Sequence, residues 1–406
     1  MKTKCKVNVI KDTKKYFFIY LQSFWINIIS LQKKVFCLSL FILNIIIQRL
    51  AYDLIKKQIN YSEGKQYINK CLNYTNIIKH DYLTESPLLS VIIPAYNCEK
   101  TIFFPIISVQ NQNISNFEII LINDFSLDNT SEILKKYGEQ DRRIKIINNK
   151  KNMGTLYSRC IATLISKGEY IFPLDNDDMI FGKDILDILD KKAKEGNYDI
   201  VGFKAVYGDS YNENIRKMRD LENYSYQNNL IIKQPELSTW LISINGKYQP
   251  HSVTLWGKLI KSRIYVKAIH LLGKKRYSTY ISWAEDTSMN FIIFNIAQSF
   301  IFIHKYGIYH LISPLSATSL QPINNKLFGL LFLLDIIFDY SSNNEVRKYS
   351  VFAALYIMKY YHKDKPIINM NNLVYLKNII FKIKKSKYID ENYKNILLKK
   401  LENFLS

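Results

Sequence analysis

From Leu88 onward, short apolar runs alternate with longer amphipathic stretches, which is the pattern of strands and helices in turn. Four apolar runs bounded by polar residues predict buried strands, at residues 89–94, 117–122, 144–147 and 170–174. Helices are predicted between them, over 99–110, from a cap at Ser126 or Asp128 to Tyr137 before Gly138, and over 154–166. Because strands that alternate with helices pair in parallel through right-handed crossovers, we expect a doubly wound α/β sheet.

Polar side chains follow the carboxyl ends of three of these predicted strands. Asn97 follows the first strand, Asn123 and Asp124 close the second, and Asp175 comes directly after the fourth. In open α/β sheets, ligands bind in the crevice outside the carboxyl ends of the strands. The convergence of these residues on one edge therefore predicts a binding site there.

The fourth predicted strand, YIFPL, ends abruptly in Asp175, Asn176, Asp177 and Asp178. Carboxylates this close repel one another unless a cation lies among them, and hard oxygen ligands suit Mg²⁺ or Mn²⁺ better than Zn²⁺. This pattern favours a divalent metal that holds a phosphate. The alternative is an acidic helix N-terminus, in which Asp177 or Asp178 caps the following helix.

The N-terminal region contains two apolar stretches, Tyr16–Leu31 and Val35–Ile47, separated by Gln32 and two lysines. A spanning helix needs about 20 mostly apolar residues, and polar residues interrupt both stretches. Two interpretations stay open: ordinary helices packed on the α/β domain, or membrane association as an anchor or a hairpin lying on the surface. Residues 49–79 predict an amphipathic connecting helix.

Composition excludes some classes of protein. The chain has 406 residues, and its 48% hydrophobic content excludes wholesale disorder. The formal charge of +21 would suit a nucleic-acid partner, but the lysines are scattered and form only short runs, so no nucleic-acid partner is predicted. The five cysteines are far apart and form no Cys-x-x-Cys pair, which indicates neither a disulfide framework nor a zinc site, and favours a reducing compartment.

Residues 88 to about 207 resemble the family-two glycosyltransferases of the GT-A fold. The motifs that carry the resemblance are, in order, LSVIIPAYN (89–97), EIILINDFSLDNT (118–130), DRRIKII (141–147), NMGTLYSR (152–159) and GEYIFPLDNDD (168–178). The later segments LWGK (255–258) and WAED (283–286) resemble the family's Trp-x-Lys and Glu-Asp segments. Asn123 and Cys160 depart from the family, which often has Asp and Asn there. The alternatives for Trp256 and Lys258 are a core aromatic residue and a solvated charge.

The resemblance implies an α/β, Rossmann-like GT-A fold, with a mixed, mostly parallel sheet flanked by helices. We expect an N-terminal helical extension over 1–86, the GT-A domain over 87–322, and a helical appendage over 323–406. The implied activity is transfer of a sugar with inversion from a nucleotide-diphospho-sugar, UDP-linked, to a glycan, lipid or protein acceptor, with Mn²⁺ or Mg²⁺ as cofactor. The alternatives are a catalytically silent binding or scaffold protein and a nucleotidyl- or phosphotransferase, although the chain has no G-x-x-x-x-G-K-[ST] phosphate loop.

The resemblance also implies roles for individual residues. Asp177 is the first expected metal ligand, with Asp175 contacting the metal or the ribose. Asp286 is the expected general base, Glu285 is the second candidate, and the alternative for Asp286 is a helix N-cap. The residues expected to hold the donor are Pro94, Tyr96, Asn97, Asn123, Asp124, Asn152, Gly154, Arg159, Asp175 and Asn176.

Two further predictions concern histidines and location. His304 and His310 lie in a strand-like run, where a hydrogen-bonded interior or surface histidine is expected rather than a metal ligand. Asn-x-Ser/Thr triplets begin at Asn60, Asn73, Asn113, Asn129 and Asn223. Because a glycan on Asn129 would obstruct the predicted donor loop, we expect a cytoplasmic protein, or a membrane-associated one whose catalytic domain faces the cytosol.

Overall fold

The computed structural model describes residues 87–208, 228–237, 254–312, 322–340 and 370–385, with a few more between 391 and 399. The predicted N-terminal extension over 1–86, with both apolar stretches, lies outside these residues. Among the helices within the described ranges, none is both long and apolar enough to cross a membrane.

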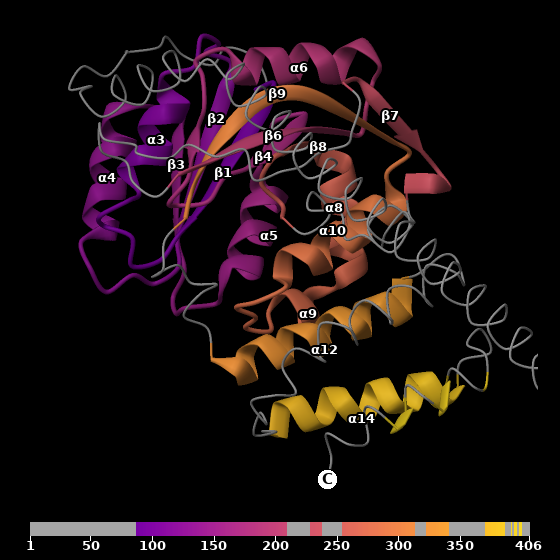
Figure 1. Cartoon of the computed structure of the whole chain (residues 1–406). Coiled ribbons are helices and arrows are strands. Elements are labelled where there is room, and N and C mark those ends of the chain that lie inside the picture. The colour runs from indigo at the N-terminus through magenta and orange to yellow at the C-terminus, as the bar shows by residue number, and fades with distance from the viewer. Residues whose placement is uncertain are drawn as a thin grey trace, which may run out of the picture. The chain divides into compact units, whose positions relative to one another are not determined.

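The strands form one mixed sheet (Figure 1). In the described ranges they are β1 Leu89–Ala95, β2 Phe117–Asn123, β3 Ile144–Asn148, β4 Tyr170–Pro173, β5 Met179–Ile180, β6 Ile200–Gly208, β7 Leu230–Lys233, β8 Lys258–Lys261 and β9 Ser299–Leu311. Strands β3, β2, β1 and β4 are parallel neighbours in that order. The sheet continues through β8, which is antiparallel to β4 and β6, to β9, which is parallel to β6. The predicted mixed, mostly parallel α/β sheet is confirmed.

Helices cover both faces of the sheet (Figure 1). Their bounds are α3 Phe103–Gln110, α4 Thr130–Gln140, α5 Thr155–Ile165, α6 Ile185–Glu195, α8 Ser262–Leu272, α9 Lys274–Tyr277, α10 Glu285–Ile296, α12 Ile323–Tyr340 and α14 Met370–Lys385. Because successive strand residues point to opposite faces, Val91 and Ile93 pack with α3, α4 and α6, whereas Ile92 packs with α5, α8 and α10. Both faces of the strands are buried, which explains their uninterrupted apolar runs.

Two local predictions were wrong. No helix follows the acidic run at once, because Met179 and Ile180 form β5 against β9, so neither Asp177 nor Asp178 caps a helix. Helix α4 also continues through Gly138 to Gln140. A Cβ at Gly138 would lie 2.8 Å from the Ile146 side chain, so the glycine lets α4 lie close to β3 instead of ending the helix.

Helix α12, at the start of the predicted helical appendage, packs into the core of the α/β domain. Phe332 and Ile336 of α12 share a buried cluster with Ile292 of α10. On its other side, α12 packs its leucines against the isoleucines of α14. Asp335 accepts hydrogen bonds from Arg276 of α9 at 2.7 Å and from Lys382 of α14 at 2.6 Å. Helix α12 is therefore fixed on both sides.

Candidate active site

Asp124, at the end of β2, organises the loop that precedes α5. Its carboxylate is buried and accepts hydrogen bonds from the backbone amides of Met153 at 2.8 Å and Gly154 at 2.7 Å, and from Asn149 Nδ2 at 2.7 Å. Gly154 has φ +88, and a Cβ there would lie 3.3 Å from the Tyr280 ring. Only glycine fits this close, left-handed position easily, so the sequence NMG forms a tight turn against Asp124.

The amide side chains at the ends of β1 and β2 hold the turn after β2. Asn97 has a left-handed backbone with φ +46, and its Oδ1 accepts a hydrogen bond from the backbone amide of Leu127 at 2.8 Å. Asn123 accepts one from the Ser126 amide at 3.0 Å and donates one to Asn148. Ser126, proposed as a helix cap, instead accepts the Asn97 amide, so the two strand ends are tied together.

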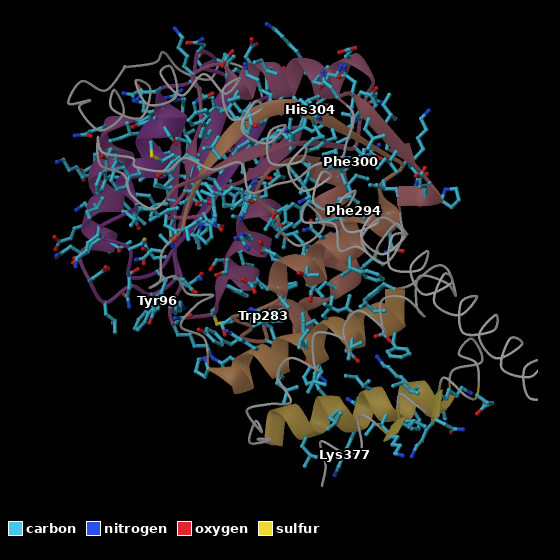
Figure 2. All side chains as sticks on the ribbon, in the orientation of Figure 1. Tyr96, Trp283, Phe294, Phe300, His304 and Lys377 are labelled. Atoms are coloured by element: carbon cyan, nitrogen blue, oxygen red, sulfur yellow. The ribbon has the colours of Figure 1, made fainter. Side chains whose placement is uncertain are left out.

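Exposed aromatic rings border this edge of the sheet. Tyr96, which directly follows β1, is 42% exposed, and Phe125, which follows the buried Asp124, is 46% exposed. Figure 2 shows Tyr96 and Trp283 on the same side of the sheet, below it in that view. Tyr280 is half exposed and lies near Tyr96 and Asp124. Burial, followed by the charges of these two residues, raises the pKa of the Tyr280 hydroxyl.

Three carboxylates gather after β4. Asp175, Asp177 and Asp178 each offer an oxygen within 4.8 Å of the others. Burial, followed by the charges of Asp178 and Asp175, raises the pKa of Asp177 to about 7. Asp178 is fully buried and accepts hydrogen bonds from His310 Nδ1 at 2.8 Å and from the Leu311 amide at 3.2 Å.

This donor set fits a hard divalent cation. The three side chains of the cluster offer oxygen ligands, and burial, followed by the charges of Asp178 and Asp175, disfavours the charged form of Asp177, which a bound cation would stabilise. Burial alone would lower the pKa of His310, but Asp178 outweighs burial and raises it to about 9. The imidazolium therefore neutralises Asp178 mainly, which leaves Asp177 as the carboxylate best suited to a metal, with Asp175, which also contacts Arg159, beside it.

Arg159 of α5 joins the acidic cluster to the Glu-Asp segment. Its buried guanidinium donates from Nη2 to Asp175 Oδ1 at 2.5 Å and from Nη1 to Asp286 Oδ1. Residues 159 and 286 are 127 positions apart in the sequence, so the pair depends on packing of α5 beside α10. Arg159 therefore brings two of the predicted site carboxylates to one side chain.

Asp286 and Glu285 form the first turn of α10 and differ in their contacts. Asp286 Oδ2 accepts a hydrogen bond from the Leu255 amide at 2.9 Å, while Arg159 binds the other oxygen. Burial raises the pKa of Asp286, and Arg159 only partly opposes this. Burial and the charge of Asp286 raise the pKa of Glu285 to about 7. Both carboxyls therefore titrate above the ordinary range of such groups.

The WGK segment is buried beside His310, the histidine that binds Asp178. The solvated-charge alternative for Lys258 is wrong, because its side chain is 0% exposed and donates to the carbonyl of Thr254. Trp256 is buried, as a core aromatic residue would be, and its ring stacks on His310 with centroids 4.9 Å apart. His304, by contrast, is exposed on β9, and its backbone amide donates to Asn228.

Other predicted residues surround the same edge. Asn152 Oδ1 accepts the Gly154 amide at 3.1 Å, Asn176 is half-buried in the acidic run, and Pro94 is buried in β1. Tyr280 and the pairing of Asp178 with His310 were not predicted from the sequence. No pattern signals Tyr280, which follows a short helix, whereas Asp178, the last residue of DNDD, was considered only as a possible helix cap.

We predict that Arg159→Ala lowers the free energy of unfolding by about 3 kcal/mol, because it leaves two half-buried carboxylates without their shared cation. Urea unfolding at neutral pH measures the change. Lys191→Ala is the control, since it removes an exposed i,i+4 pair with Asp187 and should change stability by less than about 0.5 kcal/mol. Equal, small effects of both substitutions would contradict the structural role of Arg159.

A family model described as Glycosyl transferase family 2 matches residues 90–246. Among curated relatives, the chain is 30% identical to the glycosyltransferase GlyA of Streptococcus pneumoniae, over 53% of this chain and 29% of that protein. It is 32% identical to the cholesterol galactosyltransferase of Borreliella burgdorferi, over 44% of this chain and 49% of that protein. The chain thus spans less than half of the length of either relative.

Solved structures show a likeness in fold. TarS of S. aureus, residues 1–349 in complex with UDP-GlcNAc, superposes with a TM-score of 0.56 at 18% identity, covering 78% of this chain and 89% of that one. The superposition on the longer TarS structure has a TM-score of 0.52 at 17% identity and covers 78% of this chain and 54% of that one. At such identity the likeness concerns the fold alone, and the fold is that of GT-A proteins.

Proposed function

We propose, starting from the family 2 glycosyltransferase domain that this chain contains, that the protein transfers a sugar from a nucleoside-diphosphate sugar to a hydroxyl group of an acceptor. The observation that carries this proposal is the contact of Arg159 with both Asp175 and Asp286. It joins a carboxylate cluster suited to a diphosphate-bound metal with a separate carboxylate suited to proton abstraction. Sugar transfer from such a donor needs negative charge stabilised on the departing diphosphate and a proton removed from the acceptor hydroxyl, and the two groups of carboxylates suit these two tasks.

The donor nucleoside would bind at the ends of β1 and β2. Tyr96 offers an exposed ring for stacking on a base, and the neighbouring Asn97 and Asn123 amides are held in fixed orientations. Asp124 fixes the Gly154 turn, so the backbone near the start of α5 can approach the ribose and phosphates closely. A uridine nucleotide is our proposal, supported by the TarS structures with UDP-GlcNAc and with UDP.

The diphosphate would lie against the acidic cluster. Asp177, with Asp175, would hold Mn²⁺ or Mg²⁺, and such a cation, when bound, stabilises negative charge on a diphosphate leaving group. Arg159 adds a fixed positive charge beside Asp175 and could pair with a phosphate oxygen. Asp178 stays with His310 and keeps the DNDD turn in place.

Asp286 is our proposed general base for an inverting transfer. Its carboxylate is separate from the proposed metal ligands, and its raised pKa makes it a stronger base than an ordinary aspartate. Glu285 is the competing candidate, with a pKa raised to about 7. The acceptor would be a glycan, a lipid or a protein.

The experiment is a donor-turnover assay of the full chain with a panel of UDP-, GDP- and TDP-sugars. We expect that the nucleoside diphosphate is released from one donor class when Mn²⁺ or Mg²⁺ is present. Adding EDTA should stop this release. UDP binding measured by calorimetry should show the same metal dependence. A protein that neither turns over any donor nor binds any nucleotide in the presence of metal would be a silent GT-A scaffold, contrary to the proposal.

A further inference from the structure

Gly329 of α12 meets the backbone that leads into the Glu-Asp segment. A Cβ at this position would lie 2.0 Å from the carbonyl oxygen of Trp283 and 2.8 Å from its carbonyl carbon. Both of these are backbone atoms, which cannot rotate away as the end of a side chain can. Any residue larger than glycine therefore has to push α12 away or displace the backbone at Trp283.

The Trp283 carbonyl is closely connected to both candidate bases. Ala284 follows it with a left-handed backbone, φ +61, and then α10 begins with Glu285 and Asp286. The Ala284 carbonyl accepts the first helical hydrogen bond, from the Ser288 amide at 3.0 Å. Because a residue with a Cβ has little freedom in the left-handed region, a shift at Trp283 passes directly into the first turn of α10.

Helix α12 cannot easily yield to such a shift. Phe332 and Ile336 are 0% exposed in the same cluster as Ile292 of α10, and Asp335 binds both Arg276 and Lys382. Moving the helix outward would open this core and stretch both ion pairs. The less costly response to a bulkier residue at 329 is therefore displacement of the Trp283 backbone.

We propose that Gly329 is a positioning residue: through it α12 holds the Trp283 carbonyl, and with it Glu285 and Asp286, in the arrangement that transfer requires. This inference rests on the proposed function. Helix α12 begins well beyond residue 246, where the matched family segment ends, so the role belongs to this chain's C-terminal region.

Gly329→Ala tests the inference. We expect kcat for transfer to fall about 10²-fold, the effect of displacing a catalytic group by roughly 1 Å. The dissociation constant for UDP with Mn²⁺ should stay within twofold of the wild-type value, because the residues proposed to hold the donor lie on β1, β2, α5 and the DNDD turn. Transfer kinetics and calorimetry on the full-length variant measure the two quantities separately.

Asp335→Asn is the matched control on the same helix. It weakens the ion pairs with Arg276 and Lys382 and should lower the melting temperature, yet leave kcat within about twofold, because the Gly329 contact is intact. Equal losses of kcat in both variants, or a parallel loss of UDP affinity in Gly329→Ala, would overturn the positioning role. An inactive wild-type protein would instead refute the proposed function, and the inference with it.

Ala284→Gly addresses the same segment without adding an atom, should Gly329→Ala not fold. Glycine accepts the left-handed conformation, so the fold should keep its melting temperature, but the turn that links Trp283 to α10 gains freedom. We expect kcat to fall about tenfold with unchanged UDP affinity. Wild-type kcat in this variant would show that the position of the segment does not limit transfer.

Discussion

Replacing Asp177 with alanine should abolish donor turnover and metal-dependent UDP binding, while the metal-free protein melts at the same temperature or higher. Asp177 has a pKa raised to about 7 by burial and by the charges of Asp178 and Asp175, so in the absence of metal its carboxylate opposes folding at neutral pH. Turnover assays, calorimetry with Mn²⁺ and UDP, and thermal melts measure the three effects. Retained metal-dependent affinity would exclude Asp177 as a ligand.

The same residue predicts a dependence of stability on pH. The ordinary pKa of 3.8 applies in the unfolded chain and about 7 in the metal-free fold, so the folded state binds the proton more tightly. The contribution to stability is therefore present below pH 3.8 and is lost as pH rises through about 7. Relative to Asp177→Ala, the metal-free wild type should lose stability across this window. A constant difference between the two proteins would contradict the raised pKa.

Asp286→Asn should lower kcat by about 10²–10⁴-fold, the usual contribution of a general base. Asparagine keeps an oxygen that can accept from Arg159, so UDP affinity should change little, whereas the side chain can no longer take a proton. The comparison variant is Glu285→Gln, which we expect to retain more activity. A nearly active Asp286→Asn together with an inactive Glu285→Gln would transfer the role to Glu285.

The pH profile of kcat/KM adds an independent criterion. Because burial raises the pKa of Asp286, the rate should increase with pH above the ordinary range of aspartate, as the base loses its proton. Burial and the charge of the adjacent Asp286 raise the pKa of Glu285 to about 7, so the two carboxyls titrate as a pair. If only one of the two variants, Asp286→Asn or Glu285→Gln, loses the rising part of the kcat/KM profile, that variant identifies the carboxyl that accepts the proton.

The first half of the sheet could be predicted from the sequence because its signals are local. Apolar runs bounded by polar residues defined β1 to β4 within about one residue, and the residues after them lie at the edge where Arg159 meets Asp175. The second half gave no comparable signal. Strand β6 pairs with β9 about a hundred residues later, and this pairing depends on tertiary packing rather than on a short-range pattern.

The residues of the candidate site also divide into those that local patterns predict and those that depend on long-range packing. Asp177 and Asp124 could be placed from the ends of apolar runs, whereas Asp286 could be found only through a resemblance to other sequences. Its contact with Arg159 joins elements 127 residues apart, and no spacing rule links them. Of the two interpretations of Lys258, the solvated charge is wrong: a lysine in a short segment usually indicates exposure, whereas here its ammonium group donates to the Thr254 carbonyl in the interior.

The order of the strands decides how much of the chain forms a self-sufficient folding unit. Strand β4, which delivers the acidic run, pairs on one side with β1 and on the other with β8, from residues 258–261. A fragment that stopped at residue 246 would lack β8 and β9, leaving β4 and β6 as bare, apolar edges open to pairing with other molecules. The segment that carries most of the recognisable motifs is thus not autonomous, and its solubility depends on strands that come after it.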